Sequence, residues 1–142
     1  MDKAWSPKSA SSDPRLILLA DDNSVVREAT SRLLRLMGCE VDCVCDGVAA
    51  IEAASRRTYE IILLDIQLPT MDGYATARLL RGVEALRDVP IIAVTSYAML
   101  GDREKALEAG CTGYIEKPIA PETFVTEVEQ FAKLRPAGEE TQ

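Results

Sequence analysis

Unbroken apolar runs that each stop at a polar side chain constrain the fold of this chain more than any other feature. Residues 61–64 read Ile-Ile-Leu-Leu and stop at Asp65. The same pattern recurs in residues 16–20 before Asp21 and in residues 91–94 before Thr95. Apolar runs without alternation are typical of strands that are covered on both faces, as in the centre of a parallel sheet. In such sheets the loops beyond the carboxyl ends of the strands carry the functional groups, so we expect these polar residues to meet there.

The segments between these runs complete an alternation of strands and helices. Residues 40–45 and 112–116 alternate between apolar and polar side chains, which is typical of edge strands. Apolar spacing and terminal glycine, proline or aspartate predict helices at 24–37, 46–56, 73–81 with Asp72 as its N-cap, within 99–109, and from Pro121 onward. The apolar stripe of the first helix comprises Val26, Ala29, Leu33, Leu36 and Met37. With right-handed crossovers this order predicts a doubly wound α/β fold with a five-stranded parallel sheet in the order 2-1-3-4-5.

The length of 142 residues is sufficient for one domain with a real core. Residues 1–14 and 135–142 are polar and lack periodicity, so we expect flexible tails around a domain that spans residues 15–134. Trp5 falls in the first tail, and we expect it to be exposed to solvent. The sequence contains neither a membrane-spanning apolar run nor a signal peptide, which indicates a cytoplasmic protein.

Charge and residue usage exclude several classes of function. The net charge of -7, from 23 acidic and 16 basic residues, argues against nucleic acid or an anionic membrane as a direct target. The chain contains no histidine, which excludes Ser-His or Cys-His nucleophile pairs and imidazole metal ligands. Any phosphohistidine must therefore come from another protein. The cysteines are interpreted as small buried hydrophobic residues in a reducing compartment, with a metal or redox site as the minor alternative: Cys39, Cys43, Cys45 and Cys111.

The polar residues at the strand ends form a candidate site. The predicted sheet brings the following residues to one edge: Asp21, Asp22, Asp65, Thr95 and Lys117. Three carboxylates repel one another unless a hard cation lies among them, and Mg²⁺ suits such a site because it takes one or two carboxylates and keeps several waters. A cation, an ammonium and a hydroxyl around one carboxylate describe a site for a phosphoryl group on that carboxylate, and Asp65 is the natural nucleophile. Taken singly, the paired aspartates resemble helix caps and Lys117 an ordinary edge residue.

Four motifs in register resemble the receiver domain of two-component response regulators, over about residues 15–134. They are Leu-Ala-Asp-Asp-Asn at 19–23, Leu-Asp-Ile-Gln-Leu-Pro at 64–69 with Met-Asp-Gly at 71–73, Ala-Val-Thr-Ser at 93–96, and Gly-Tyr-Ile-Glu-Lys-Pro-Ile at 113–119. The resemblance implies the flavodoxin-like fold of that family and a bacterial signalling protein rather than an enzyme. The sequence departs from the family's usual pattern at Ala120, where a Ser or Asp that caps the fifth helix is common.

The resemblance also implies roles for individual residues. Asp65 would accept a phosphoryl group from a phosphohistidine on a sensor histidine kinase or a histidine phosphotransfer protein. Asp22, Asp65 and the backbone carbonyl of Gln67 would bind Mg²⁺ directly, and Asp21 would act largely through a water. Lys117 would pair with the phosphoryl oxygens.

Signal output would follow from two further residues that the resemblance implies. Thr95 would move toward the phosphoryl group, and Tyr114 would be the aromatic switch residue that follows it. The surface that changes for a downstream protein would comprise the fourth helix, the fifth strand and the fifth helix. The Lys117–Pro118 peptide bond would be cis, in a turn that aims Lys117 inward.

Other functions compete with a stand-alone phosphorylation-dependent signalling module. An aspartyl-phosphate phosphatase would need a second carboxylate two residues after the nucleophile, where this chain has Gln67. A flavin or nucleotide binder is disfavoured because no glycine-rich phosphate loop follows any strand. A receiver-fold scaffold that binds proteins without phosphorylation, or a receiver that forms part of a hybrid histidine kinase, remains an alternative on sequence alone.

Overall fold

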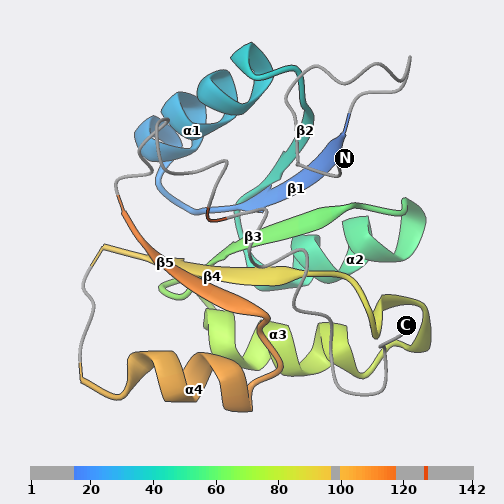
Figure 1. The fold of residues 1–142 in the computed structure, drawn as a ribbon, viewed down its shortest axis with the longest axis vertical. Helices are drawn as coiled ribbons and strands as arrows, with labels where there is room; N and C mark the ends of the chain where they lie inside the picture. Colours follow the sequence, from blue (N-terminus) through green and yellow to red (C-terminus); the bar gives the residue numbers. More distant parts are fainter. Residues whose placement is uncertain (1–14, 97–99, 118–126, 128–142) are drawn as a thin grey trace.

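A computed structural model describes residues 15–96, 100–117 and 127 of the chain. It contains a parallel sheet in the order β2-β1-β3-β4-β5, with β1 at Leu16–Ala20, β2 at Glu40–Val44, β3 at Ile61–Asp65, β4 at Ile91–Thr95 and β5 at Gly113–Glu116 (Figure 1). The predicted doubly wound α/β fold and its strand order are therefore confirmed. Strands β3 and β4 are buried throughout and β1 nearly so, whereas β2 and β5 alternate, as the sequence pattern indicated.

The helices that connect the strands are α1 at Ser24–Leu36, α2 at Gly47–Arg56, α3 at Gly73–Arg81, a short 3₁₀ turn at Glu84–Leu86, and α4 at Asp102–Glu108. Polar side chains begin the first three helices. Asn23, Asp46 and Asp72 each accept a hydrogen bond from a backbone N–H of the first turn, which satisfies a donor that has no partner within the helix. The predicted cap at Asp72 is thus confirmed. Of the expected helix from Pro121, the structure describes residue 127 alone, which is helical. The Lys117–Pro118 bond, Trp5 and Ala120 fall outside the described residues.

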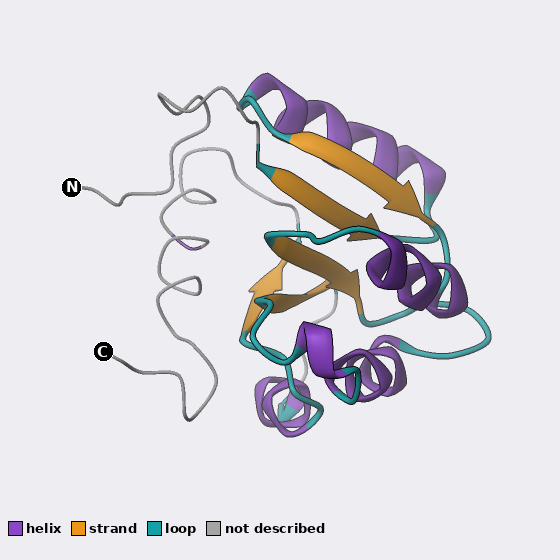
Figure 2. Cartoon of the chain, turned by 90° about the vertical axis from the view of Figure 1, so that its right-hand side faces the viewer, coloured by secondary structure: helices purple, strands orange, loops and turns teal. Residues whose placement is uncertain are grey.

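Helices lie on both sides of the sheet (Figure 2). Two hydrophobic clusters cover the two faces of the sheet. One cluster joins β1, β3 and β4 to apolar side chains of α2, α3 and α4. The other joins the opposite side chains of the same strands to Leu34 of α1 and to Ile115 of β5. Because successive side chains of a strand point to opposite faces, continuous apolar strands supply both clusters at once. Among the described residues, no helix is long and apolar enough to cross a membrane.

The buried side of α1 differs from the predicted apolar stripe. Leu34 and Ser31 are the buried residues of the helix, whereas Leu36 is 81% exposed and Ala29 is also exposed. Ser31 tolerates burial because its hydroxyl donates a hydrogen bond to the carbonyl of Glu28 at 3.1 Å. An open groove of about 690 Å³ runs along the exposed side of the helix and includes three residues of the predicted stripe. It is lined by Ser24, Val25, Glu28, Ala29, Arg32, Leu33 and Leu36.

The prediction of buried cysteines is correct for two residues and wrong for the other two. Cys39 and Cys111 are buried, and burial raises the pKa of each thiol to about 11. Cys43 and Cys45 are exposed. The reason is their position, since Cys43 lies near the end of the edge strand β2 and Cys45 lies in the loop that follows.

Candidate functional site

The ends of four neighbouring strands supply the side chains of the candidate site. Asp21 and Asp22 follow β1, Asp65 ends β3, Thr95 ends β4, and Lys117 follows β5. Because the strands are parallel and adjacent in the order β1-β3-β4-β5, these ends lie along one edge of the sheet. The structure therefore brings the predicted residues to the same edge.

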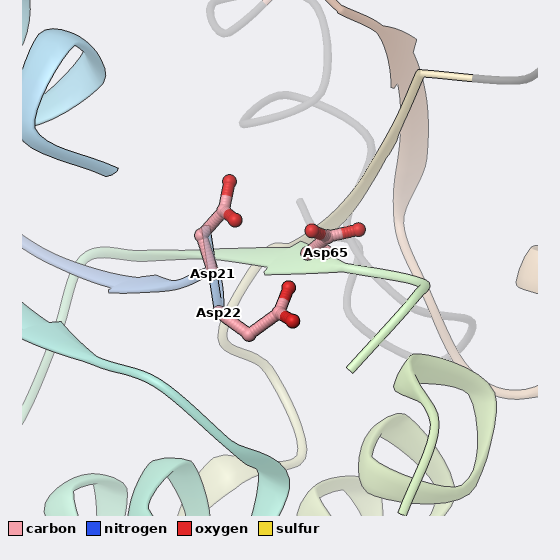
Figure 3. Close-up of side chains that lie close together, drawn as sticks. All are labelled: Asp21, Asp22 and Asp65. Carbon is pink, nitrogen blue, oxygen red and sulfur yellow. The ribbon is translucent and has the colours of Figure 1, made fainter. Parts of the chain in front are cut away.

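The three aspartates lie side by side where β1 and β3 end (Figure 3). Each offers a carboxylate oxygen, and these oxygens lie within 4.8 Å of one another. Asp21 and Asp65 are buried, whereas Asp22 is exposed. Oxygen donors in this number, with one side open to water, fit a hard divalent cation that retains part of its hydration shell.

Lys117 joins the two buried carboxylates. Its Nζ donates a hydrogen bond to Oδ2 of Asp21 at 2.9 Å and to Oδ2 of Asp65 at 3.1 Å. Burial by itself lowers the pKa of the Lys117 ammonium, but its bonds with Asp21 and Asp65 outweigh this effect and raise the pKa overall. The side chain of Lys117 is 12% exposed, so the two contacts are largely shielded from water.

Burial dominates the acidity of Asp65. It raises the pKa of this carboxyl, although the Gln67 N–H and the Lys117 ammonium both lower it in part. Nearby Asp21 adds a further increase. The ionised form of Asp65 is therefore held in an unfavourable environment that a second positive charge would relieve.

Backbone N–H groups hold the remaining oxygens of the two buried carboxylates. Oδ1 of Asp65 accepts a hydrogen bond from the N–H of Gln67 at 2.9 Å, and Oδ1 of Asp21 accepts one from the N–H of Asn23 at 2.9 Å. Each carboxylate is thus fixed on one side by the loop that follows its strand and on the other side by Lys117. The predicted role of the Gln67 carbonyl as a metal ligand stays a prediction.

The start of α3 packs directly on the end of β3. The N–H of Gly73 donates to the carbonyl of Ile66 at 2.7 Å, and the N–H of Ile66 donates to the carbonyl of Val94 at 3.1 Å. A Cβ atom at Gly73 would lie only 2.5 Å from the carbonyl oxygen of Asp65. Only glycine allows this approach, which fixes the backbone on which Asp65 stands.

Thr95 and Tyr114 lie on the neighbouring strands β4 and β5. Thr95 is buried, and its carbonyl accepts a hydrogen bond from the N–H of Lys117 at 2.7 Å. Tyr114 is paired with Ala93 in the register of β4 and β5, so its side chain lies on the face of the sheet that Thr95 also uses. Burial, followed by the nearby carboxylate of Asp102, raises the pKa of Tyr114.

Sequence reasoning missed the residues that surround Tyr114. Asp102 begins α4 and accepts a hydrogen bond from the Tyr74 hydroxyl at 3.1 Å, and the Arg103 guanidinium lies 5.9 Å from the centre of the Tyr114 ring. In the sequence, Asp102 follows a glycine at the start of a helix and looks like an ordinary first-turn acid. Its contact with a tyrosine 28 positions earlier has no local signal.

Comparisons with known proteins agree with this geometry. The profile of the response regulator receiver domain matches residues 17–129. The polar-differentiation response regulator DivK of Brucella anthropi is 32% identical over 118 residues, which cover 83% of this chain and 96% of that protein. DivK of Brucella ovis is 33% identical over 115 residues, covering 81% of this chain and 94% of that protein.

Solved structures agree as well. The receiver domain of the sensor histidine kinase PA1611 from Pseudomonas aeruginosa, which has a magnesium ion coordinated in its active site cleft, is 38% identical with a TM-score of 0.78. That similarity covers 85% of this chain and 99% of the other. The chemotaxis response regulator CheY4 of Vibrio cholerae is 25% identical with a TM-score of 0.78, covering 84% of this chain and 99% of that one.

Proposed function

This chain belongs to the response regulator receiver domain family of two-component signalling, and from that premise we propose that Asp65 accepts a phosphoryl group from a phosphohistidine of a partner protein. The partner is a sensor histidine kinase or a histidine phosphotransfer protein, which supplies the histidine that this chain lacks. The observation that carries the proposal is the contact of Lys117 with both Asp21 and Asp65 beside a third carboxylate.

The carboxylate cluster fits a bound Mg²⁺. Asp22 and Asp65 would hold the ion directly together with the Gln67 carbonyl, and Asp21 would act through a water. When bound, Mg²⁺ supplies positive charge next to the phosphoryl oxygens, where charge builds up during transfer. The donor set supports this choice, since hard oxygen ligands with an exposed member suit an ion that keeps several waters.

Asp65 itself makes the new bond. One carboxylate oxygen attacks phosphorus, an O–P bond forms, and the P–N bond to the donor imidazole breaks with its electron pair left on nitrogen. Lys117 already donates to Oδ2 of Asp65, so its ammonium lies where it can pair with an oxygen of the transferred group. The Gln67 N–H holds the other carboxylate oxygen and orients the nucleophile.

Signal output follows from Thr95 and Tyr114. A phosphoryl group on Asp65 draws the Thr95 hydroxyl toward it, and the space left behind admits the Tyr114 ring. The surface of α4, β5 and the predicted fifth helix then differs between the two states. A downstream protein that prefers one state binds the phosphorylated chain more tightly, by no more than its difference in affinity for the two states.

Phosphorylation of the purified chain tests the proposal. Acetyl phosphate with Mg²⁺ should add the mass of one phosphoryl group, and Asp65→Asn should abolish the addition. Asp72→Asn is a matched control, because this carboxylate caps α3 and should leave the addition intact. If Asp65→Asn still gained this mass, Asp65 would not be the acceptor. A folded wild-type chain that gains no mass would instead favour a scaffold that works without phosphorylation.

A further inference from the structure

The Tyr114 hydroxyl is enclosed without a hydrogen bond in the observed position. The ring packs against the hydrophobic cluster beneath α2, α3 and α4. Within the described part of the chain, its hydroxyl is buried and makes no hydrogen bond of standard length and angle. A buried hydroxyl without an acceptor is unfavourable, so the ring gains from a small shift that brings an acceptor within reach.

Asp102 provides such an acceptor. Its carboxylate is already fixed, because the hydroxyl of Tyr74 on α3 donates to Oδ1 at 3.1 Å. A carboxylate accepts several hydrogen bonds at once, so it can take the Tyr114 hydroxyl as well as that of Tyr74. The pKa of Tyr114 is raised by burial and then by this carboxylate more than by any other charge, which agrees with their proximity.

The neighbouring residue of α4 contacts the other part of the same ring. The Arg103 guanidinium lies 5.9 Å from the ring centre, a distance at which a cation is attracted to an aromatic face. The first turn of α4 therefore acts on Tyr114 at two points, the hydroxyl and the ring. Both interactions favour the position of the ring against α4.

We propose that Asp102 is a positioning residue for Tyr114. Anchored by Tyr74, its carboxylate accepts a hydrogen bond from Tyr114 after a small shift of the ring against α4, and this bond opposes the turn of the ring toward Thr95. The inference rests on the proposed function, in which that turn accompanies phosphorylation. It adds the group that sets the balance between the two ring positions in the unphosphorylated chain.

Fluorotyrosine labelling of the whole chain measures the ring position directly. The chain has four tyrosines, so the ¹⁹F spectrum is simple, and Tyr114→Phe assigns the signal of interest. Spectra are recorded without addition and during titration with beryllofluoride and Mg²⁺, which stand in for the phosphoryl group. The variants are Asp102→Ala, Tyr74→Phe and the control Glu104→Gln, which removes an exposed charge from the same helix.

Without beryllofluoride, Asp102→Ala should move the Tyr114 signal toward the position that wild type reaches with beryllofluoride. Tyr74→Phe should move it in the same direction by less, because it frees the carboxylate but does not remove it. The beryllofluoride concentration for half conversion should fall about fivefold in Asp102→Ala and remain unchanged in Glu104→Gln. If Asp102→Ala does not fold, Tyr74→Phe carries the same test.

A double-mutant cycle separates positioning from a general structural role. In a Tyr114→Phe background, where half conversion is read from the ¹⁹F signal of the bound beryllofluoride, Asp102→Ala should no longer change the half-conversion concentration, because the hydroxyl on which it acts is gone. An equal change in both backgrounds would overturn the proposal, and so would an unmoved Tyr114 signal in both Asp102→Ala and Tyr74→Phe. If wild type fails to bind beryllofluoride at Asp65, the proposed function fails, while the spectra without addition still decide the role of Asp102.

Discussion

Two largely enclosed cations lie at opposite ends of the sheet, and their partners differ in kind. At the carboxyl end, Lys117 donates to the carboxylates of Asp21 and Asp65. Near the amino ends of β4 and β5, the Arg81 guanidinium donates to backbone carbonyls and one hydroxyl, those of Leu86, Arg87, Val89, Gly110 and Thr112. Arg81 thus ties the end of α3 to the loops before β4 and β5.

Because of this difference, a metal ion or a proton can replace part of the charge of Lys117 but cannot replace Arg81. The partners of Lys117 are negatively charged, so a metal ion or a proton can substitute for part of its charge. The partners of Arg81 are neutral dipoles arranged for a planar fork of donors, which neither a metal ion nor a proton reproduces. Burial is the main cause that lowers the pKa of Arg81, while the carboxylates raise that of Lys117 against the same effect.

The largest expected effect comes from Arg81→Met. Several carbonyls would lose their donor, so the free energy of unfolding should fall by about 3 to 5 kcal/mol. Mg²⁺ should restore none of this loss. Urea unfolding with and without Mg²⁺ measures both quantities, and Arg56→Met on the exposed end of α2 is the matched control. If Mg²⁺ restored the free energy of unfolding of Arg81→Met, the proposed difference between Arg81 and Lys117 would be wrong.

Lys117→Met should have a smaller effect that depends on metal. Without Mg²⁺ the buried pair Asp21 and Asp65 would lose its cation, and the free energy of unfolding should fall by about 2 to 3 kcal/mol. With Mg²⁺ most of this loss should disappear, because an ion that binds only the folded state stabilises it. Melting temperatures across an Mg²⁺ titration provide the measurement. An identical deficit at every Mg²⁺ concentration would contradict the proposed ligand set.

Asp65→Asn should raise stability in the absence of metal at pH 7, by about 1 kcal/mol. The folded-state pKa of Asp65 lies above its ordinary value of 3.8, so the folded chain binds this proton more tightly than the unfolded chain. The cost of ionising Asp65 therefore appears as pH rises through the folded pKa and is absent below 3.8. The advantage of Asp65→Asn should shrink as unfolding is measured from pH 7 toward pH 4. A constant advantage would point to a cause other than ionisation.

An equally small effect is expected for Thr112→Val. The Thr112 hydroxyl accepts from Arg81 at 3.3 Å and from the N–H of Ile91 at 3.2 Å, so its loss should lower the free energy of unfolding by about 1 kcal/mol. Mg²⁺ should not change the loss. Thr58→Val at an exposed loop position is the control. A larger loss in Thr58→Val than in Thr112→Val would remove Thr112 from the Arg81 network.

The sheet and the edge that carries the aspartates were predictable because their signals are local. The continuous apolar run that ends at Asp65 predicts a buried strand, and it also predicts that the Asp65 side chain lies at the end of that strand. The buried side of α1 was not predictable in the same way, because Ser31 enters the core through a bond to its own helix while Leu36 remains outside. Apolar spacing alone cannot choose between two flanks of one helix.

The Arg81 and Asp102 contacts were not predictable for a different reason. Arg81 donates mainly to backbone carbonyls. Every residue has a backbone carbonyl, so the sequence does not indicate which ones accept these hydrogen bonds. Asp102 meets Tyr74 across the gap between two helices, so neither residue is recognisable without the fold. The predicted fifth helix, apart from residue 127, and the cis bond before Pro118 lie outside the described residues and stay predictions.

The close approach at Gly73 also limits how sequences of this kind can change over time. Any side chain there would press on the carbonyl of Asp65, and at Gly47 on α2 a Cβ would collide with the Thr76 hydroxyl on α3. A mutation at Gly73 must therefore be accompanied by a backbone shift under Asp65, and one at Gly47 by a displacement of Thr76 between two helices. Substitutions at these two glycines should be removed by selection long before those at most charged surface residues.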